Sequence, residues 1–220
     1  LAQVSLQNKG IQISEGGLTG TYTAAQLHFH WGSSGMPGSE HSIDGERYAA
    51  ELHIVHTKDS SGRSESGGAT TGTERTIAVL GFFIEEGPTD NTKYGNIINA
   101  LNTIRSKDST TVLNVKLQDL IPEEIYLEHF YRYDGSLTTP ECYETVIWTV
   151  FPETIKLSRD QLDAFYTKLN YSADAVMVEN FRPVQKLGGR TVYTSGVEAV
   201  LSCSRHLLLA LIVTYIASTS

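Results

Sequence analysis

The sequence predicts a mainly β fold of the α+β class, in which strands dominate and two or three helices accompany them. Four segments are rich in β-branched and aromatic residues or alternate apolar with polar residues, as strands do; they are residues 26–31, 49–55, 76–84 and 143–151. Only residues 94–105 and 158–169 place apolar residues at helical spacing. With 220 residues, 40% of them apolar, the chain is expected to form one folded domain, which we place at residues 1–194.

The remaining segments predict turns and loops between these elements. Residues 4–22 contain short strand-like runs broken by glycines, which indicates an antiparallel region with turns. Residues 32–47 are rich in Gly, Ser and Pro and form a predicted loop, and residues 59–73 are predicted to be an exposed loop. Residues 76–84 are continuously apolar and too short for a typical helix, so we expect a central strand. Ser158 and Gln161 have capping-box spacing at the start of the second helix.

Charge and cysteine content exclude several classes of protein. The chain has 25 acidic and 17 basic residues, a net charge of −8, and no basic run, so nucleic acid is not an expected partner. Its two cysteines, Cys142 and Cys203, form no C-x-x-C pair, which excludes an iron–sulfur cluster or a structural zinc finger. The two cysteines either form one disulfide or each pairs with a cysteine that is not in this sequence.

The C-terminal segment predicts a membrane anchor. Residues 207–217 are an apolar run of eleven residues, short of the roughly 18 to 20 that span a bilayer as a helix. The small residues Ser195 and Gly196, a spacer of about ten residues and this tail have the layout of a signal for a GPI lipid anchor, which we place at residues 195–220. The alternative is a buried or amphipathic terminal helix. The chain does not begin with Met and shows no signal peptide, so we expect an N-terminally incomplete sequence. The predicted anchor places the protein on the extracellular face of the plasma membrane.

Three histidines point to a catalytic zinc. His28 and His30 are two residues apart in a predicted strand, so their side chains lie on one face of it. His53 lies in the next predicted strand and can face them if the two strands are antiparallel neighbours. Three protein ligands with a fourth position left for water are the pattern of catalytic zinc. Taken singly, each histidine could instead be an ordinary structural residue.

Two polar residues are placed to hold the rings of these histidines. Gln26 precedes His28 by two positions, and Glu51 precedes His53 by two, so each shares a strand face with a candidate ligand. Hydrogen bonds from the second ring nitrogen to such groups fix the tautomer of a metal-binding histidine. A glutamate inside so apolar a strand is costly to bury without a partner, although an exposed Glu51 is the alternative.

Six motifs, in this order and approximate spacing, resemble the α-class carbonic anhydrases: QLHFHWG, EHSIDGERYAAELHIVH, AVLGFF, YDGSLTTPE, VIWTV and VENFRPVQ. The resemblance extends from about residue 1 to residue 193, and the apolar tail makes the chain resemble most the membrane-anchored, type IV-like members. It implies a large twisted, mostly antiparallel central sheet with peripheral helices and a conical cavity that ends at zinc.

The resemblance also implies the activity, a zinc lyase that reversibly hydrates carbon dioxide to bicarbonate and a proton by attack of zinc-bound hydroxide. It makes aromatic sulfonamides the expected inhibitors. Two alternatives remain: a carbonic-anhydrase-like binding domain without activity, and a zinc hydrolase of another type. The absence of an H-E-x-x-H motif disfavours the hydrolase.

Roles for individual residues follow from the same resemblance. His28, His30 and His53 are the implied zinc ligands, supported by Gln26, Glu51 and the backbone carbonyl of Asn180. Thr138 accepts a hydrogen bond from the hydroxide and donates its own proton to Glu40, and Thr139 contacts bicarbonate. The other implied residues are the network members His41 and Tyr133 and the apolar carbon dioxide wall formed by Val55, Val79, Leu137, Val146 and Trp148.

The sequence departs from the family pattern in several places. Family members carry a segment before the position of Leu1 that includes the usual proton-shuttle histidine and a cysteine that pairs at the position of Cys142. This sequence has neither, and Cys203 lies in the tail, so we expect slow turnover that imidazole buffer accelerates. Phe181 replaces a usual tryptophan and Glu141 a common proline. The tripeptide that begins at Asn170 is a possible glycosylation site, which would make the protein a glycoprotein.

Overall fold

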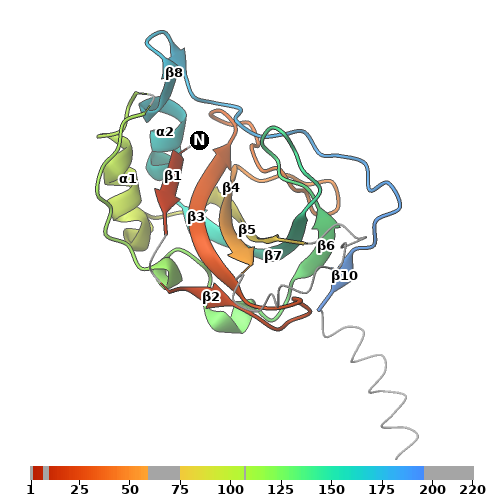
Figure 1. Ribbon diagram of the computed structural model, residues 1–220. Coiled ribbons are helices and arrows are strands. Elements are labelled where there is room, and N and C mark those ends of the chain that lie inside the picture. The colour runs from red at the N-terminus through yellow and green to blue at the C-terminus, as the bar shows by residue number, and fades with distance from the viewer. Residues whose placement is uncertain (1, 7–9, 59–74, 107, 196–220) are drawn as a thin grey trace, which may run out of the picture.

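The computed structural model describes residues 2–6, 10–58, 75–106 and 108–195. They form an eight-stranded sheet in the order β1-β3-β4-β5-β7-β6-β10, with β2 also paired to β3 (Figure 1). The strands are β1 (Ala2–Ser5), β2 (Gln12–Ile13), β3 (Tyr22–Trp31), β4 (Ala50–Lys58), β5 (Ile77–Glu86), β6 (Tyr131–Gly135), β7 (Val146–Leu157) and β10 (Tyr193–Thr194). All neighbours are antiparallel except β5 and β7. The predicted mainly β, mostly antiparallel fold is therefore confirmed.

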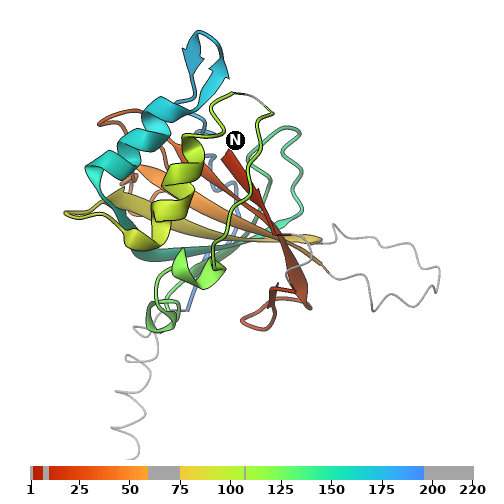
Figure 2. The same ribbon diagram turned by 90° about the vertical axis from the view of Figure 1, so that its left-hand side faces the viewer.

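The helices are few and short. They are α1 (Gly95–Leu101) and α2 (Arg159–Lys168), with 3-10 turns η1 (Thr92–Tyr94), η2 (Leu117–Asp119) and η3 (Glu124–Tyr126). A small hairpin of β8 (Asn170–Ser172) and β9 (Ala175–Val176) follows α2 and projects from the body of the protein (Figures 1 and 2). Both views show α1 and α2 packed on the same face of the sheet, so the helices are peripheral as expected.

The alternation of residues along β3 gives the sheet two different faces. Leu27, Phe29 and Trp31 point toward the helices and are 0–2% exposed, because they pack with Leu162 and Phe165 of α2 in the main hydrophobic core. The rings of Phe29 and Trp31 lie 5.2 and 5.5 Å from the ring of Phe165. The residues between them point to the other face. The apolar residues of β3 therefore form part of the core, and the residues that alternate with them lie on the opposite face of the sheet.

The predicted helices differ in how closely the structure follows them. Ser158 caps α2, with Gln161 N–H donating to Ser158 Oγ at 3.3 Å and Ser158 N–H donating to Gln161 Oε1 at 3.2 Å, so the predicted capping box is present. The segment predicted as a helix over residues 94–105 is shorter. It has no side-chain cap at Tyr94, and at Asn102 the backbone turns to the tighter i−3 bonding that ends helices.

Strand boundaries show a similar mixture. The predicted strand at residues 143–151 begins at Val146 and continues to Leu157, because its last residues pair with the end of β5 beyond the part that β6 flanks. Strand β6 was not predicted, since its Arg132 and Asp134 give it a polar sequence. The predicted loop at residues 32–47 contains two isolated bridges, Ser33 with Met36 and Ile43 with Glu46. The loop predicted at residues 59–73 and the anchor signal predicted at 195–220 lie outside the described residues, apart from Ser195. Within the described part, no helix is long and apolar enough to cross a membrane.

Candidate metal centre

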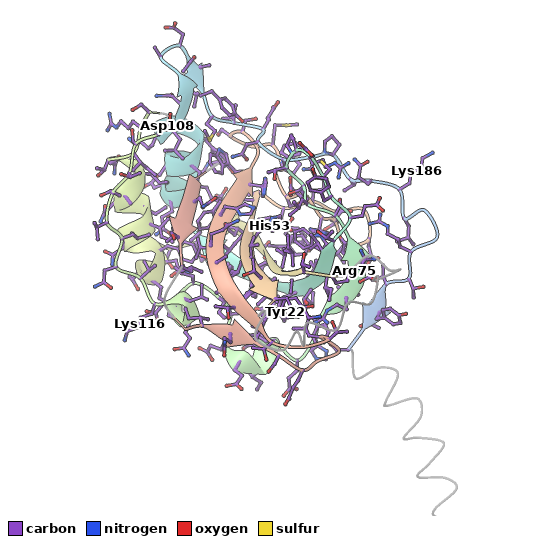
Figure 3. The ribbon with its side chains drawn as sticks, viewed as in Figure 1. Tyr22, His53, Arg75, Asp108, Lys116 and Lys186 are labelled. Atoms are coloured by element: carbon purple, nitrogen blue, oxygen red, sulfur yellow. The ribbon has the colours of Figure 1, made fainter. Side chains whose placement is uncertain are left out.

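The register of β3 and β4 brings the three predicted histidines together. His28 pairs directly with His53, and His30 pairs with Glu51, all on the face of the sheet opposite the helices. One ring nitrogen from each histidine lies within 4.8 Å of the other two, and the side chains are almost completely buried. Figure 3 shows His53 in the interior of the protein, over the curved sheet. The arrangement follows from strand pairing alone, because directly opposed residues of an antiparallel pair share a face.

Each histidine is fixed by a hydrogen bond from the ring nitrogen that faces away from the cluster. His28 Nδ1 donates to Gln26 Oε1 at 2.8 Å, His30 Nδ1 to the carbonyl of Asn180 at 2.8 Å, and His53 Nε2 to Glu51 Oε1 at 2.7 Å. Each acceptor is an oxygen, so each of these nitrogens must carry the ring proton. The lone pairs of His28 Nε2, His30 Nε2 and His53 Nδ1 are therefore turned toward one another.

This donor set fits a zinc ion. His30 Nε2 is buried and has no hydrogen-bond partner among the described residues, which is costly unless a cation accepts its lone pair. His53 Nδ1 and His28 Nε2 are 3.3 Å apart, and two nitrogens bound at about 2.0–2.1 Å to a tetrahedral zinc would be separated by about 3.3–3.4 Å. Three neutral imidazoles with an open fourth position are the chemistry of a catalytic zinc site.

Burial keeps these rings neutral. It lowers the pKa of His28 to about 2 and that of His30 to about 3, with repulsion from His53 acting in the same direction. A histidine must be deprotonated to bind a metal, so both rings are in the binding form throughout the physiological pH range.

Glu51 organises the neighbourhood of His53. It is 0% exposed and accepts four hydrogen bonds: Oε2 from the backbone N–H groups of Glu40 and His41, and Oε1 from the rings of His41 and His53. Burial alone would raise the pKa of Glu51, but the charges and ring hydrogen bonds of His41 and His53 lower it well below its usual value. Although His41, Glu51 and His53 also cluster closely, they are bonded to one another and offer no free metal position.

The hydrogen-bond network continues from His41 to Tyr133. His41 Nδ1 donates to Glu51 Oε1, and His41 Nε2 shares a hydrogen bond with the Tyr133 hydroxyl at 2.6 Å. Burial raises the pKa of Tyr133 further above the physiological range, so the hydroxyl stays protonated. The predicted network residues His41 and Tyr133 thus lie in one chain of contacts that ends at a candidate ligand.

Glu40 and Thr138 lie beside the cluster and line a cavity of about 260 Å³ together with His41, Tyr133, Ser136 and Arg182. Glu40 Oε1 accepts from the backbone N–H of Arg182 at 2.7 Å. Burial raises the pKa of Glu40, and the charge of His53 and a hydrogen bond from Thr138 partly oppose the rise. Glu40 Oε2 is buried and has no hydrogen-bond partner of regular geometry in the described part of the chain.

The five predicted wall residues form one small hydrophobic cluster. Val79, Val146 and Trp148 are buried, and Val55 and Leu137 pack against them. The ring of Trp148 lies 4.7 Å from the ring of His53, which places the wall directly beside the histidines. Thr139 is half-buried in the turn that follows Thr138, where its carbonyl accepts from the N–H of Cys142, and it does not line the cavity. Cys142 is a free, half-buried cysteine, and Cys203 lies outside the described residues.

Two features of the site were not predicted. A Cβ on Gly81 would lie 3.2 Å from Glu51 Oε1, so this glycine leaves room for the buried carboxylate. An isolated glycine in the apolar run of β5 is the kind of signal that indicates such a close approach. The second feature is Arg47, which donates to the carbonyl of Ser39 and lies over the ring of Phe181, and its sequence context gave no sign of either contact.

Comparison with known proteins shows the family of this chain. The family described as eukaryotic-type carbonic anhydrase matches residues 1–196. The chain is 47% identical to carbonic anhydrase 4 of Oryctolagus cuniculus and 43% identical to that of Rattus norvegicus, each over 84% of this chain and 60% of the relative. It is 37% identical to carbonic anhydrase 12 of Homo sapiens, over 89% of this chain and 56% of that relative. The chain thus spans about 60% of the length of the carbonic anhydrase 4 relatives. It belongs to the eukaryotic-type carbonic anhydrase family.

Proposed function

We propose that this protein binds one zinc ion through His28, His30 and His53 and catalyses the reversible hydration of carbon dioxide to bicarbonate and a proton. The observation that carries the proposal is the convergence of three ring nitrogens whose opposite nitrogens are all committed to hydrogen bonds. The carbonic anhydrase names of its relatives support the choice of reaction.

Zinc bound in this way supplies a Lewis acid and brings the pKa of water on its open position to about 7, a value measured on carbonic anhydrases themselves. Gln26, Glu51 and the carbonyl of Asn180 hold the three rings in the tautomers that the metal needs. Because Glu51 also takes three hydrogen bonds from the 40–41 segment and the His41 ring, it ties the orientation of His53 to the position of Glu40.

Thr138 and Glu40 select and orient the nucleophile in this proposal. The Thr138 hydroxyl donates a hydrogen bond to the Glu40 carboxylate, which leaves the Thr138 oxygen only able to accept. A hydroxide in the site would then have to donate a hydrogen bond to Thr138, so its lone pair would be directed at the substrate. Arg182, whose N–H donates to Glu40 Oε1, keeps the carboxylate in place for this task.

The cluster of Val55, Val79, Leu137, Val146 and Trp148 is the proposed position for carbon dioxide. Carbon dioxide is apolar and has to bind weakly beside the nucleophile, so an apolar wall suits it better than a charged clamp. The contact between Trp148 and His53 supports this placement, since it sets the wall next to the metal ligands. Thr139 is the proposed contact for bicarbonate, through movement of the turn in which it lies.

We also propose that the protein acts at the outer face of the plasma membrane, held there by a GPI anchor that replaces residues 195–220. The apolar run at residues 207–217 and the similarity to carbonic anhydrase 4 support this proposal. Asn170 is a proposed glycosylation site, at the start of the projecting β8–β9 hairpin with exposed Tyr171 and Ser172 beside it. Release of the protein from cells by a phosphatidylinositol-specific phospholipase C tests the anchor, and a mass shift on deglycosylation tests Asn170.

A stopped-flow measurement of carbon dioxide hydration on the purified chain tests the activity. The proposal predicts one zinc per chain, hydration that is lost when a chelator removes zinc, and inhibition by aromatic sulfonamides. In Thr138→Val, which keeps the side-chain shape, we expect kcat/KM to fall by about 10² because one oriented hydrogen bond is lost. Zinc binding without hydration would instead support the non-catalytic binding domain, and a folded chain without zinc would contradict the proposal altogether.

A further inference from the structure

Two backbone segments that are far apart in sequence meet at the candidate metal centre. Residues 39–41 supply the Glu40 carboxyl and two N–H donors to Glu51. Residues 180–182 supply the carbonyl that accepts from His30 and the N–H that donates to Glu40 Oε1. The geometry of the site therefore depends on how these two segments are held against each other.

The side chain of Arg47 spans both segments. Its Nε donates to the Ser39 carbonyl at 2.9 Å, and its Nη2 donates to the same oxygen. Its guanidinium carbon lies 4.2 Å from the centroid of the Phe181 ring, a cation–π contact. Ser39 directly precedes Glu40, and Phe181 lies between Asn180 and Arg182. One planar side chain therefore contacts the residue next to each functional group.

Arg47 does not serve as a partner in an ion pair of the described residues. No ion pair with a carboxylate is recorded for it in the described part of the chain, in contrast to Arg75 and Arg159, which pair with Asp134 and Glu86. Its guanidinium donates to the carbonyl oxygen of Ser39 and lies over the ring of Phe181. A planar fork is suited to both at once, whereas the compact ammonium of lysine can serve only one of them well.

We propose that Arg47 and Phe181 act as a positioning pair that sets the Glu40 carboxyl and the Asn180 carbonyl relative to the three histidines. Neither residue touches the cavity, so the pair acts through Ser39, Glu40, Asn180 and Arg182. The inference rests on the proposed function for its effect on turnover, but its effects on zinc affinity and on backbone hydrogen bonds are independent of that reaction.

Arg47→Lys is the direct test, with zinc affinity measured by competition against a chromophoric chelator. We expect zinc affinity to fall by about 3- to 10-fold, less than the 10- to 100-fold typical of a direct partner of a ligand. We expect kcat to fall by a similar factor with KM unchanged, because the substrate wall is untouched. Phe181→Leu should reproduce these losses and Phe181→Trp should recover them, since tryptophan restores the cation–π contact.

Arg105→Lys is the matched control, because Arg105 also donates to a backbone carbonyl, that of Asn102, but on the exposed surface. It should change neither zinc affinity nor turnover. The double variant Arg47→Lys with Phe181→Leu should lose no more than the worse single variant, because both substitutions break the same contact.

Amide hydrogen exchange of the zinc-free chain separates this inference from the proposed function. In Arg47→Lys, the N–H groups of Glu40, His41 and Arg182 should exchange at least about tenfold faster, while the melting temperature stays within about 2 °C. This readout applies even if the wild-type chain binds no zinc or hydrates no carbon dioxide. Faster exchange with unchanged zinc affinity would reduce Arg47 to a structural role and overturn the proposal, as would unchanged exchange.

Discussion

The two faces of β3 and β4 are formed by alternate residues of the same two strands, and they differ in chemistry. Leu27, Phe29, Leu52 and Ile54 point to the helices, are 0–2% exposed, and contact other apolar side chains without direction. The residues that alternate with them, on the opposite face, include His28, His30 and His53. In each of these rings, the nitrogen that faces away from the cluster donates to a specific oxygen. The comparison teaches that a sheet can separate stability from chemistry by the alternation of its side chains alone.

His56 sharpens this comparison, because it is the second histidine on β4 but lies on the helix-facing side with Leu52 and Ile54. It is 1% exposed and its Nδ1 donates to the carbonyl of Ile54. It is an ordinary structural histidine in the same strand as the candidate ligand His53. The two residues therefore offer a matched pair that differs in face but not in residue type or strand.

Of the substitutions on the face that carries the histidine cluster, His53→Ala should have the largest effect on zinc affinity. With only two histidines left, zinc affinity is expected to fall by more than about 100-fold, since even indirect partners of a ligand contribute 10- to 100-fold. Titration with a competing chelator measures the change. His56→Gln is the control and should leave zinc affinity as it is. Equal losses of zinc affinity in His53→Ala and His56→Gln would contradict the assignment of metal binding to one face of the sheet.

Phe29→Ala should produce the opposite pattern. Its ring packs against Phe165 and Tyr94, so removing it leaves a cavity and should lower the free energy of unfolding by about 3–5 kcal/mol. Below its lowered melting temperature the variant should still bind one zinc per chain. Urea unfolding and metal analysis measure the two quantities. Loss of zinc from the folded variant would show that the core sets the metal geometry directly.

Glu51→Gln should have an intermediate effect. An amide nitrogen cannot accept a hydrogen bond, so two of the four donors aimed at the carboxylate lose their acceptor. Zinc affinity should fall by about 10- to 100-fold. Glu86→Gln, in which an exposed carboxylate beside Arg159 is changed, is the control and should have no effect. Unchanged zinc affinity in Glu51→Gln would mean that the tautomer of His53 is fixed in another way.

The smallest predicted effect concerns the pH dependence of stability. Burial lowers the pKa of His56, against the opposing hydrogen bonds to the carbonyls of Ile54 and Ala78. The unfolded chain then binds a proton below about pH 6.5 that the folded chain does not, so stability falls as pH falls, by at most about 1.4 kcal/mol per unit.

His56→Gln should remove this contribution, which unfolding at pH 7 and pH 5.5 can measure. The loss of stability on acidification should be smaller by about 1 kcal/mol in the variant than in the wild type. An identical pH dependence in both proteins would show that His56 does not contribute.

Much of the fold and the cluster could be predicted because both depend on periodicity along single strands. The i, i+2 spacing of Gln26, His28 and His30 places them on one face, and the antiparallel pairing on which the placement of His53 depended is present. Strand β6 could not be recognised from its polar residues, because its place in the sheet depends on pairing with β7. The helix at α1 ends early because its last turn changes its hydrogen bonding, which residue periodicity does not report.

Other parts of the site depend on contacts that no local pattern records. The acceptor for His30 is a backbone carbonyl 150 residues away, which any residue type could supply, and Asn180 was indicated only by the resemblance to a family. The contact between Arg47 and Phe181 joins a loop to a distant segment, and no local sequence pattern indicated that these two residues meet. Long-range backbone contacts are thus the physical limit of the sequence prediction here.

X-ray absorption at the zinc edge of the zinc-loaded chain tests the central claim most directly. The account predicts one zinc per chain with three nitrogen neighbours at about 2.0–2.1 Å, imidazole outer-shell scattering, and one oxygen neighbour. His53→Ala should remove one of the three imidazoles. Zinc that is bound mainly by carboxylate oxygens or by sulfur, or a spectrum that His53→Ala does not change, would contradict the account.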